Sequence, residues 1–263
     1  PFYIMKRIHA KKYLGQHFLK EVSIAEKIAL TLPNQKNFSV LEIGPGMGML
    51  TQFILKQEHQ LKLVEIDSES VAYLKEHYPA LRNHIIEKDV LKLDFDELFG
   101  NAPFAVIGNF PYNISSQIVF KVLKHRNRIP FFAGMFQKEV AKRLCEAPGT
   151  KQYGILSVLV QLFYETSYLF EVPPGAFIPP PNVDSAVIQF QRKENYTLNC
   201  DEKLLFKVVK LSFQQRRKTL RNSLKTLGIP ENIREDSIFD LRPEKLSGQS
   251  FVELTKRISD GQL

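Results

Sequence analysis

The sequence predicts an α/β protein: a doubly wound sheet of mostly parallel strands that ends in an antiparallel pair, followed by a small all-α domain. In the first two-thirds of the 263 residues, apolar β-branched runs alternate with helical patterns, as is typical of a parallel sheet. Two strand patterns then follow each other with only a proline-rich connection between them, which indicates an antiparallel pair. After residue 193 the patterns are helical, which indicates a separate helical domain.

The predicted elements succeed one another along the chain in an α/β order. Strands are expected at residues 38–43, 61–66, 84–87, 104–109 and 131–137. Helices are expected between them at 49–57, 68–78 and 115–124, the second with Ser68 as its N-cap. The antiparallel pair is expected at 164–172 and 184–192, and the last helices at 202–213, 216–227, 231–233 and 250–258. We therefore expect a first domain at 1–193, with a basic arm at 1–20, and a second domain at 194–263.

The composition excludes several classes of protein. With 44% hydrophobic and 24% charged residues, the chain is globular and is neither disordered nor of low complexity. Two cysteines cannot build a disulfide framework, and the six histidines lack metal-binding spacing, so no metal is expected. No apolar run has the length of a membrane helix or the context of a secretory signal. We expect a cytoplasmic protein with no membrane partner, whose natural start is Met5.

The formal net charge of +8 comes from two segments of the chain. Residues 1–20 hold five basic residues and no acid, and residues 192–225 carry a net charge of +7, so the rest of the chain is acidic. In the predicted helix 216–227, Arg217 and Arg221 share one face, while Leu220 and Leu224 share another. A helix of this kind docks by its apolar face and presents its basic face to phosphates. The sequence therefore predicts nucleic-acid binding by Lys11, Lys12, Arg216, Arg217, Lys218 and Arg221.

A glycine-rich loop follows the first predicted strand and reads Glu-Ile-Gly-Pro-Gly-Met-Gly over residues 42–48. Glycines let the backbone approach a ligand closely, and the helix that follows favours polar groups at its N-terminus. Glu65 ends the next strand, where a carboxylate can accept hydrogen bonds from a ribose diol, and Asp89 follows the third strand, where it could accept from an adenine amine. Together these features predict a nucleoside site. The dinucleotide fingerprint would need Gly or Ala in place of Met49, and no Lys-Ser/Thr pair follows for a P-loop.

The tetrapeptide Asn-Phe-Pro-Tyr at residues 109–112 follows the fourth predicted strand. Since ligands of open α/β sheets bind at the carboxyl ends of the strands, we expect this motif to face the nucleoside loop. At this point the sequence resembles the ribosomal RNA adenine dimethyltransferase family over nearly its whole length. The motifs that carry the resemblance lie at residues 11–19, 42–48, 65–67, 89–90, 109–112, 177–185 and 216–221.

The resemblance implies a Rossmann-like class I methyltransferase fold and S-adenosylmethionine as cofactor. It also implies that the enzyme dimethylates N6 of two adjacent adenosines near the 3′ end of small-subunit ribosomal RNA during ribosome biogenesis. The substrate would be presented within a pre-30S particle, to a monomeric enzyme. Cofactor contacts are expected from His17, Leu19, Gly44, Gly46, Glu65, Asp89 and Asn109. His17 stands where some members of the family have Asn.

The residues of the tetrapeptide suggest how an adenine amine could be made reactive. We expect the side-chain carbonyl of Asn109, and the backbone carbonyl before or at Pro111, to accept hydrogen bonds from the N6 hydrogens. These bonds would free the nitrogen lone pair, which is otherwise delocalised into the ring. Tyr112 is expected to stack on the target base, with Phe177 as the second face.

Three other interpretations share some of these residues. A large-subunit RNA adenine methyltransferase of the antibiotic-resistance type would share the motifs up to Ser185, but residues 241–247 resemble the small-subunit branch. A non-catalytic RNA-binding assembly factor on the same fold is disfavoured by the intact tetrapeptide. A nicotinamide dehydrogenase is disfavoured by Met49 and by the lack of an acid–base residue for hydride transfer.

Overall fold

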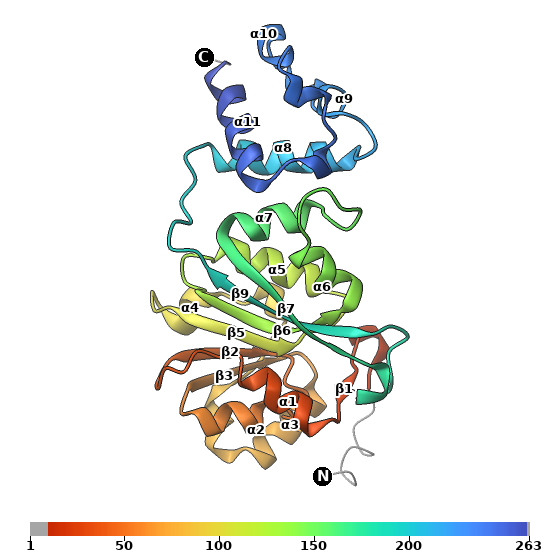
Figure 1. The fold of residues 1–263 in the computed structure, drawn as a ribbon. Coiled ribbons are helices and arrows are strands. Elements are labelled where there is room, and N and C mark those ends of the chain that lie inside the picture. Colours follow the sequence, from red (N-terminus) through yellow and green to blue (C-terminus); the bar gives the residue numbers. More distant parts are fainter. Residues whose placement is uncertain (1–9, 262–263) are drawn as a thin grey trace. The chain divides into compact units, whose positions relative to one another are not determined.

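The computed structural model describes residues 10–261, which form two compact units (Figure 1). The first unit runs to Ala141 and resumes with Ser167–Arg192. The second unit contains Lys142–Thr166 and the chain from Lys193 onward. The C-terminal part of the second unit begins next to the expected domain boundary at residues 193 and 194. The segment Lys142–Thr166, which was expected in the first domain, also belongs to the second unit. The expected start at Met5, and residues 1–9 of the basic arm, lie outside the described residues.

A seven-stranded sheet forms the centre of the first unit, in the order β4-β3-β2-β5-β6-β9-β7. Its strands are β2 (Ser39–Ile43), β3 (Gln60–Glu65), β4 (Ile85–Glu87), β5 (Phe104–Asn109), β6 (Phe131–Gln137), β7 (Tyr164–Val172) and β9 (Ser185–Arg192). β2 pairs in parallel with β3 and β5, β3 with β4, and β5 with β6, whereas β9 is antiparallel to β6. The predicted α/β class and doubly wound sheet are confirmed.

The chain reverses its direction of winding between β2 and β5. From β2 it adds β3 and β4 on one side, and it then returns to add β5 and β6 on the other. Glu42 lies opposite Ile107 in the parallel register, so both strands end at the same edge of the sheet. Such a switch point opens a crevice at the carboxyl ends of the strands, where ligands bind.

Two paired glycines, Gly108 of β5 and Gly134 of β6, let a phenylalanine pack against the sheet. A Cβ added at Gly134, where φ is +156°, would lie 2.2 Å from the carbonyl oxygen of Gly108 and 2.4 Å from the ring of Phe110. The Phe110 ring is buried and stacks on Phe132 at a centroid distance of 5.0 Å. These glycines therefore fix the start of the Asn-Phe-Pro-Tyr motif by leaving room for its second residue.

Helices cover both faces of this sheet (Figure 1). One face carries α1 (Val22–Ala29), α2 (Thr51–Ile54) with its 3-10 continuation Leu55–Gln57, and α3 (Ser68–His77); the other carries α4 (Phe95–Phe99) and α5 (Ser115–Lys124). Short 3-10 turns flank β4 at Pro79–His84 and Val90–Lys92. The prediction that Ser68 caps α3 is wrong. Asp67 is the cap and accepts from the Glu69 N–H at 3.4 Å, because the strand end before it leaves Asp67 extended at the helix start.

A two-stranded sheet ties the N-terminal segment to the proline-rich segment, and the sequence analysis did not expect it. The strands β1 (Phe18–Leu19) and β8 (Phe177–Ile178) pair antiparallel. A 3-10 turn, Lys12–Leu14, precedes β1, and another, Pro174–Ala176, precedes β8. Two-residue strands carry no readable periodicity, so only their pairing in the folded chain reveals them.

The second unit is helical. Its elements are the second half of α6 (Lys138–Cys145), α7 (Ile155–Phe163), α8 (Glu202–Gln214), α9 (Leu220–Ser223), α10 (Glu231–Arg234), α11 (Gly248–Asp260) and 3-10 turns at Lys225–Leu227, Ser237–Asp240 and Pro243–Lys245. α7, α8 and α11 pack against one another, and α7 is buried on nearly all sides. α7 is apolar except at Ser157 and Gln161, and so short an apolar run cannot be assigned to a helix or a strand from its periodicity alone.

The prediction of one helix over 216–227 is wrong. The chain after α8 forms a turn, and α9 starts only at Leu220. Tertiary contacts compete with the helix here: the Leu220 N–H donates to the Leu241 carbonyl at 2.9 Å. Leu220 and Leu224 are buried as expected. Arg217 lies in the turn and so does not share a helical face with Arg221. In the described part of the chain no helix combines the length and apolarity needed to cross a membrane.

We expect Gly134→Ala to destabilise the protein by about 1–3 kcal/mol, because overpacking at this point displaces the Phe110 ring or the β5 backbone. Urea denaturation followed by circular dichroism measures the effect. Gly175→Ala is the control, since an added Cβ there meets no atom within 4 Å. Equal stabilities of the two variants would contradict this account of the close approach.

Candidate active site

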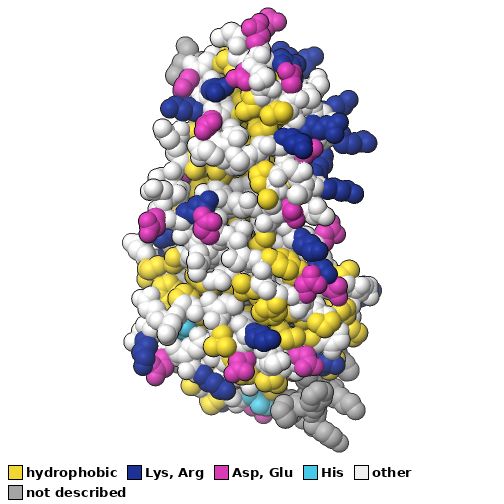
Figure 2. Space-filling view, viewed as in Figure 1, with side chains coloured by type: hydrophobic (Ala, Val, Ile, Leu, Met, Phe, Trp, Pro, Cys, Tyr) yellow, Lys and Arg dark blue, Asp and Glu magenta, His cyan; other side chains and the backbone are white. Residues whose placement is uncertain are grey.

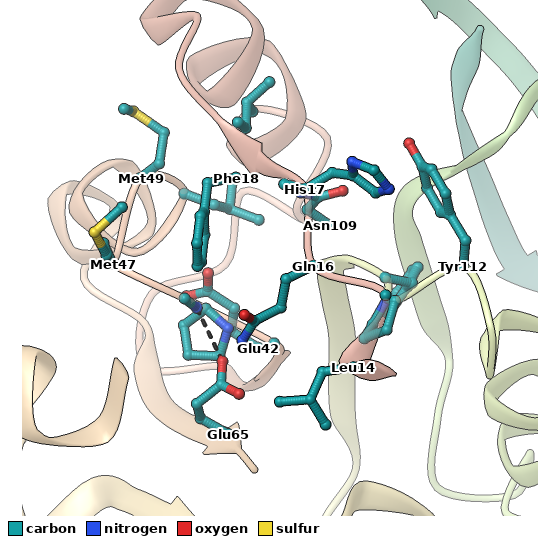
Figure 3. A pocket seen from close by; sticks show the side chains of 18 of the residues that line it. Leu14, Gln16, His17, Phe18, Glu42, Met47, Met49, Glu65, Asn109 and Tyr112 are labelled. Carbon is teal, nitrogen blue, oxygen red and sulfur yellow. Dashed lines mark hydrogen bonds between the residues drawn. The ribbon is translucent and has the colours of Figure 1, made fainter. Parts of the chain in front are cut away.

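A pocket lies in the first unit at the edge where β2 and β5 end (Figure 3). Three stretches of chain supply most of its lining: residues 14–19 before and within β1, the glycine loop after β2, and residues 109–112 after β5. Glu65 and Ile66 from the end of β3 complete one side. The glycine loop, Glu65 and the Asn-Phe-Pro-Tyr motif, which the sequence placed at one sheet edge, therefore meet at one pocket.

The backbone of the glycine loop adopts a conformation that glycine favours. Gly44, Gly46 and Gly48 have φ values of +67°, +55° and +81°, in the left-handed region that favours glycine. A Cβ at Gly46 would come within 3.0 Å of the Phe18 ring, which lies over the loop (Figure 3). The loop can therefore approach a ligand with its backbone, and Phe18 covers it from the N-terminal segment.

Glu65 is held by three backbone donors at the end of β3. Its Oε2 accepts from the Gly46 N–H at 3.1 Å, and its Oε1 accepts from the N–H groups of Ile66 and Asp67 at 2.8 and 3.0 Å. The side chain is 6% exposed, and burial raises its pKa while these bonds oppose that shift. A carboxylate has about four acceptor positions, so one remains for a ligand hydroxyl.

The side-chain amide of Asn109 has a fixed orientation. Its Nδ2 donates to the backbone carbonyl of His17 at 3.0 Å. A carbonyl can only accept, so the nitrogen must face His17. The Oδ1 atom is thereby left as an acceptor at the pocket, as the proposed handling of an amine requires. The carbonyl of Pro111 accepts from the Ile114 N–H at 3.2 Å, which favours the carbonyl of Phe110 as the second acceptor.

Tyr112 faces the His17 ring across the pocket, with ring centroids 5.4 Å apart and planes 27° apart (Figure 3). The Tyr112 hydroxyl is hydrogen-bonded to the Ser185 hydroxyl, and His17 Nδ1 lies 2.9 Å from the Pro179 carbonyl oxygen. Burial raises the pKa of Tyr112, so its hydroxyl stays neutral. Phe177, which was expected as the second stacking face, is 1% exposed within the core and is absent from the pocket lining.

The other predicted cofactor residues divide into two groups. Leu19 and Gly44 line the pocket beside Gly46 and His17. Asp89 does not line it; its Oδ1 accepts from the Leu91 N–H at 2.9 Å and caps the 3-10 turn that follows β4. This turn position is typical of Asp at any helix start, which the sequence pattern does not distinguish from a ligand contact.

A buried carboxyl that the sequence analysis did not single out also lines the pocket. Glu42 is fully enclosed, and Thr51 donates its hydroxyl to Oε2 at 2.7 Å. Burial raises the pKa of Glu42 to about 8, so the group is mainly protonated near neutral pH. A glutamate within an otherwise apolar strand was the available sequence signal.

The predicted RNA-binding cations fall into paired and exposed groups. Lys11 is paired with Asp67, Arg216 donates to the Lys151 carbonyl at 2.8 Å, and Arg221 binds Asp240 at 2.8 Å. Lys12, Arg217 and Lys218 are exposed. In Figure 2 the Lys and Arg side chains of the second unit gather on the side where Figure 1 places the connection from α8 to α9. Within the described range, no cluster of three or more His, Cys, Asp or Glu side chains could hold a metal ion.

Comparison with known proteins gives the family of this chain. The family model described as ribosomal RNA adenine dimethylase matches residues 7–259. The chain belongs to this family. Among its curated relatives, ribosomal RNA small subunit methyltransferase A of Flavobacterium johnsoniae is 58% identical over 98% of this chain and 99% of its own length. The protein of the same name from Bacteroides thetaiotaomicron is 52% identical over 97% and 96%.

Solved structures share the fold over nearly the same length. A dimethyladenosine transferase from Plasmodium falciparum has a TM-score of 0.79 and 26% identity, with 94% of this chain and 99% of that chain covered. The 23S rRNA methyltransferase ErmE has a TM-score of 0.67 and 25% identity, with 90% and 99% covered. The predicted family, the predicted enzyme class and the S-adenosylmethionine cofactor that goes with them are confirmed by these likenesses.

The buried Glu42 gives the free energy of unfolding a pH dependence. The folded protein keeps this proton up to a pKa of about 8, whereas the unfolded chain releases it near the ordinary value of 4.5. The free energy of unfolding should therefore decrease as the pH rises from 4.5 to about 8, and this group contributes about 1.4 kcal/mol per pH unit to the decrease. We expect Glu42→Gln to remove that slope in denaturant titrations at pH 5, 6.5 and 8. Glu76→Gln, at an exposed position on α3, is the control; identical slopes in all three proteins would contradict the assignment.

Proposed function

We propose that this chain uses S-adenosylmethionine to dimethylate N6 of two adjacent adenosines near the 3′ end of small-subunit ribosomal RNA during ribosome biogenesis. The single observation that carries this proposal is the amide of Asn109, whose nitrogen is bound to the His17 carbonyl and whose oxygen is left as an acceptor at the pocket. An adenine amine presents two N–H donors, and it is the group that such an acceptor would bind.

The relatives support the small subunit as the source of the RNA. Proteins that are 52–58% identical over nearly the whole chain are named small subunit methyltransferase, whereas the 23S rRNA methyltransferase ErmE is 25% identical. A large-subunit substrate is therefore the second candidate and has weaker support. Mapping the methylated positions in ribosomal RNA by primer extension distinguishes the two.

The pocket fits S-adenosylmethionine by the chemistry of its lining. Gly44 and Gly46 give backbone access that a Cβ would close, and Glu65 keeps an acceptor position for a ribose hydroxyl. His17 and Leu19 would hold the cofactor from the N-terminal segment, while Asp89 could contribute its free carboxylate oxygen near the adenine. When bound, the cofactor supplies an electrophilic methyl group on its sulfonium.

The chain's own contribution to the reaction is to hold and polarise the amine. Asn109 Oδ1 and the Phe110 carbonyl at the peptide bond to Pro111 would each accept one N6 hydrogen. Two acceptors so placed favour a pyramidal nitrogen with an available lone pair, and they stabilise the positive charge that develops on it. Because the amide is fixed by His17 and the Phe110 ring by the glycines below it, this arrangement exists before substrate binds.

Tyr112 would stack on the target base, which must leave its helix or come from an unpaired loop to reach the pocket. Its hydroxyl bond to Ser185 fixes the direction in which the ring points. The His17 ring already stacks on Tyr112 at a centroid distance of 5.4 Å, so it would meet the second face of the base only after swinging aside. Phe177 could take this role only if the segment around β8 moved.

The exposed cations, Lys12 near the pocket and Arg217 and Lys218 in the second unit, would bind the phosphates of the RNA. We propose that the RNA is presented within a pre-30S particle, to a monomer in the cytoplasm. Basic surfaces of this kind give affinity without sequence specificity. The structure of the particle would therefore determine which adenosines reach the pocket.

Asn109→Ala should lower methyl transfer at least 100-fold, because it removes an acceptor for the charge that develops on N6. RNA binding should stay within about twofold of the wild type, since base stacking and phosphate contacts remain. Transfer of labelled methyl groups to small ribosomal particles from an unmethylated strain measures the first quantity, and filter binding measures the second.

Asn113→Ala is the matched control for that experiment. Asn113 is an exposed asparagine four residues further along the same loop, and its amide nitrogen donates to the Tyr13 carbonyl at 3.4 Å. This variant should keep nearly normal turnover. Near-normal methylation by Asn109→Ala would contradict the role of Asn109 as an acceptor for the amine. Absence of methyl transfer by the wild type would contradict the proposed function.

Arg217→Ala should weaken RNA binding and reduce the slope of log affinity against log salt by about one, because one phosphate contact is lost. Arg217 is a cleaner test than Arg221, whose guanidinium also binds Asp240. Lys256→Ala, at an exposed cation on α11, controls for loss of charge alone. An unchanged slope for Arg217→Ala would mean that the turn after α8 is not an RNA-binding surface.

A further inference from the structure

Residues 14–19 form a cover over the pocket, and all six of them line it. Three contacts with distant parts of the chain hold the second half of this cover, residues 17–19. Asn109 donates to the His17 carbonyl, His17 Nδ1 meets the Pro179 carbonyl, and β1 pairs with β8. The first half of the cover has no strand to hold it, so its position depends on the residues that come before it.

Lys11 and Gln16 hold that first half to the start of α3. The Lys11 ammonium forms an ion pair with Asp67 and a second one with Glu69 at 3.1 Å. Gln16 donates from Nε2 to Asp67 at 3.1 Å and accepts from the Lys11 backbone N–H at 2.8 Å. The chain from Lys11 to Gln16 is thus a closed loop, fastened at both ends to one carboxylate.

Asp67 connects this loop directly to the cofactor site. Its N–H donates to Glu65 Oε1 at 3.0 Å, and its carboxylate also accepts from the Ser70 hydroxyl at 2.9 Å. The Asp67 side chain is 1% exposed and that of Lys11 is 23% exposed, so the ion pair is largely shielded from solvent. A buried carboxylate that lost its cation would be left with the neutral donors of Gln16, Ser70 and the Glu69 N–H, which makes the pair costly to break.

We infer that Lys11 is a positioning residue for cofactor binding: through Asp67 it fastens residues 14–19 over the pocket and against the turn that carries Glu65. This inference rests on the proposed function, since it concerns the S-adenosylmethionine site. It also changes the predicted role of Lys11, whose charge is committed to the protein and not to RNA phosphates.

The next residue provides the contrast. Lys12 is exposed and lines a second hollow of the first unit together with Tyr112, Asn182 and the prolines at 179–181. This hollow shares four lining residues with the pocket: Gly15, Gln16, His17 and Tyr112. Two adjacent lysines of one motif therefore have different tasks, since Lys11 faces the carboxylates of α3 and Lys12 faces the side from which RNA reaches Tyr112.

The test compares Lys11→Met with Lys12→Met in the full-length protein. Lys11→Met should raise the dissociation constant for S-adenosylmethionine, measured by calorimetry without RNA, by roughly tenfold, or about 1.4 kcal/mol. It should raise the KM for the cofactor by a similar factor, with kcat at saturating cofactor within about twofold of the wild type. Hydrogen exchange at the backbone amides of residues 14–19 should become faster. Lys12→Met should leave cofactor affinity unchanged and should weaken RNA binding with a reduced salt slope.

Two further variants keep the test decisive. Lys11→Arg retains the charge and should recover most of the affinity, which separates the ion pair from a general loss of folding. In a background with both Asp67→Asn and Glu69→Gln, Lys11→Met should have little further effect, because both ion-pair partners of the ammonium are already neutral. If Lys11→Met binds the cofactor as the wild type does and instead loses RNA affinity, Lys11 is an RNA contact and the inference is overturned. If the wild type itself binds no cofactor, the proposed function fails instead.

Discussion

The parallel pairing of β2 with β5 is the constraint on which the rest of the site depends. Because Glu42 lies opposite Ile107, the glycine loop and the Asn-Phe-Pro-Tyr motif leave the sheet at one edge, although more than 60 residues separate them in the sequence. The glycines of β5 and β6 then admit the Phe110 ring, which anchors the motif from below. A shift of register by one residue would turn the side chains of β5 to the other face and separate Asn109 from the loop.

Long-range hydrogen bonds convert this edge into a covered pocket. The N-terminal segment reaches β8 through a two-residue strand, Asn109 through the His17 carbonyl, and α3 through Asp67. The Asn109 bond that holds the segment also turns the amide oxygen toward the pocket. The position of the cover and the orientation of this acceptor are therefore coupled through one carbonyl group.

Three carboxyls at this edge are stabilised in three different ways. Glu42 is buried beside a single hydroxyl and avoids the cost of a buried charge by keeping its proton. Glu65 is nearly as buried but accepts three backbone N–H bonds, which compensate a negative charge. For Asp67, the Lys11 ion pair and the Gln16 and Ser70 hydrogen bonds lower the pKa despite its burial. Glu65 therefore keeps an acceptor position at the pocket, while the proton on Glu42 and the cation beside Asp67 limit the negative charge at this edge.

The sequence alone predicted the parallel strands, the helices α2, α3 and α5 between them, and the sheet edge at which the site lies, but not α1, α4 or α6. Alternating apolar patterns and strand-end motifs are local and follow from residue type. It did not determine β1 and β8 or the turn after α8, because these depend on contacts with distant segments. The cap of α3 and the mostly apolar helix α7 were missed for local reasons, since Asp67 and Ser68 are both good caps and a short apolar run has no distinctive period. The cations show the same division. Composition located the positive charge in two segments, but only the folded chain decided that Lys11, Arg216 and Arg221 bind partners within the protein, while Lys12, Arg217 and Lys218 stay exposed. A charge is committed by whichever opposite group or carbonyl lies beside it in space, and that neighbour is set by the tertiary fold.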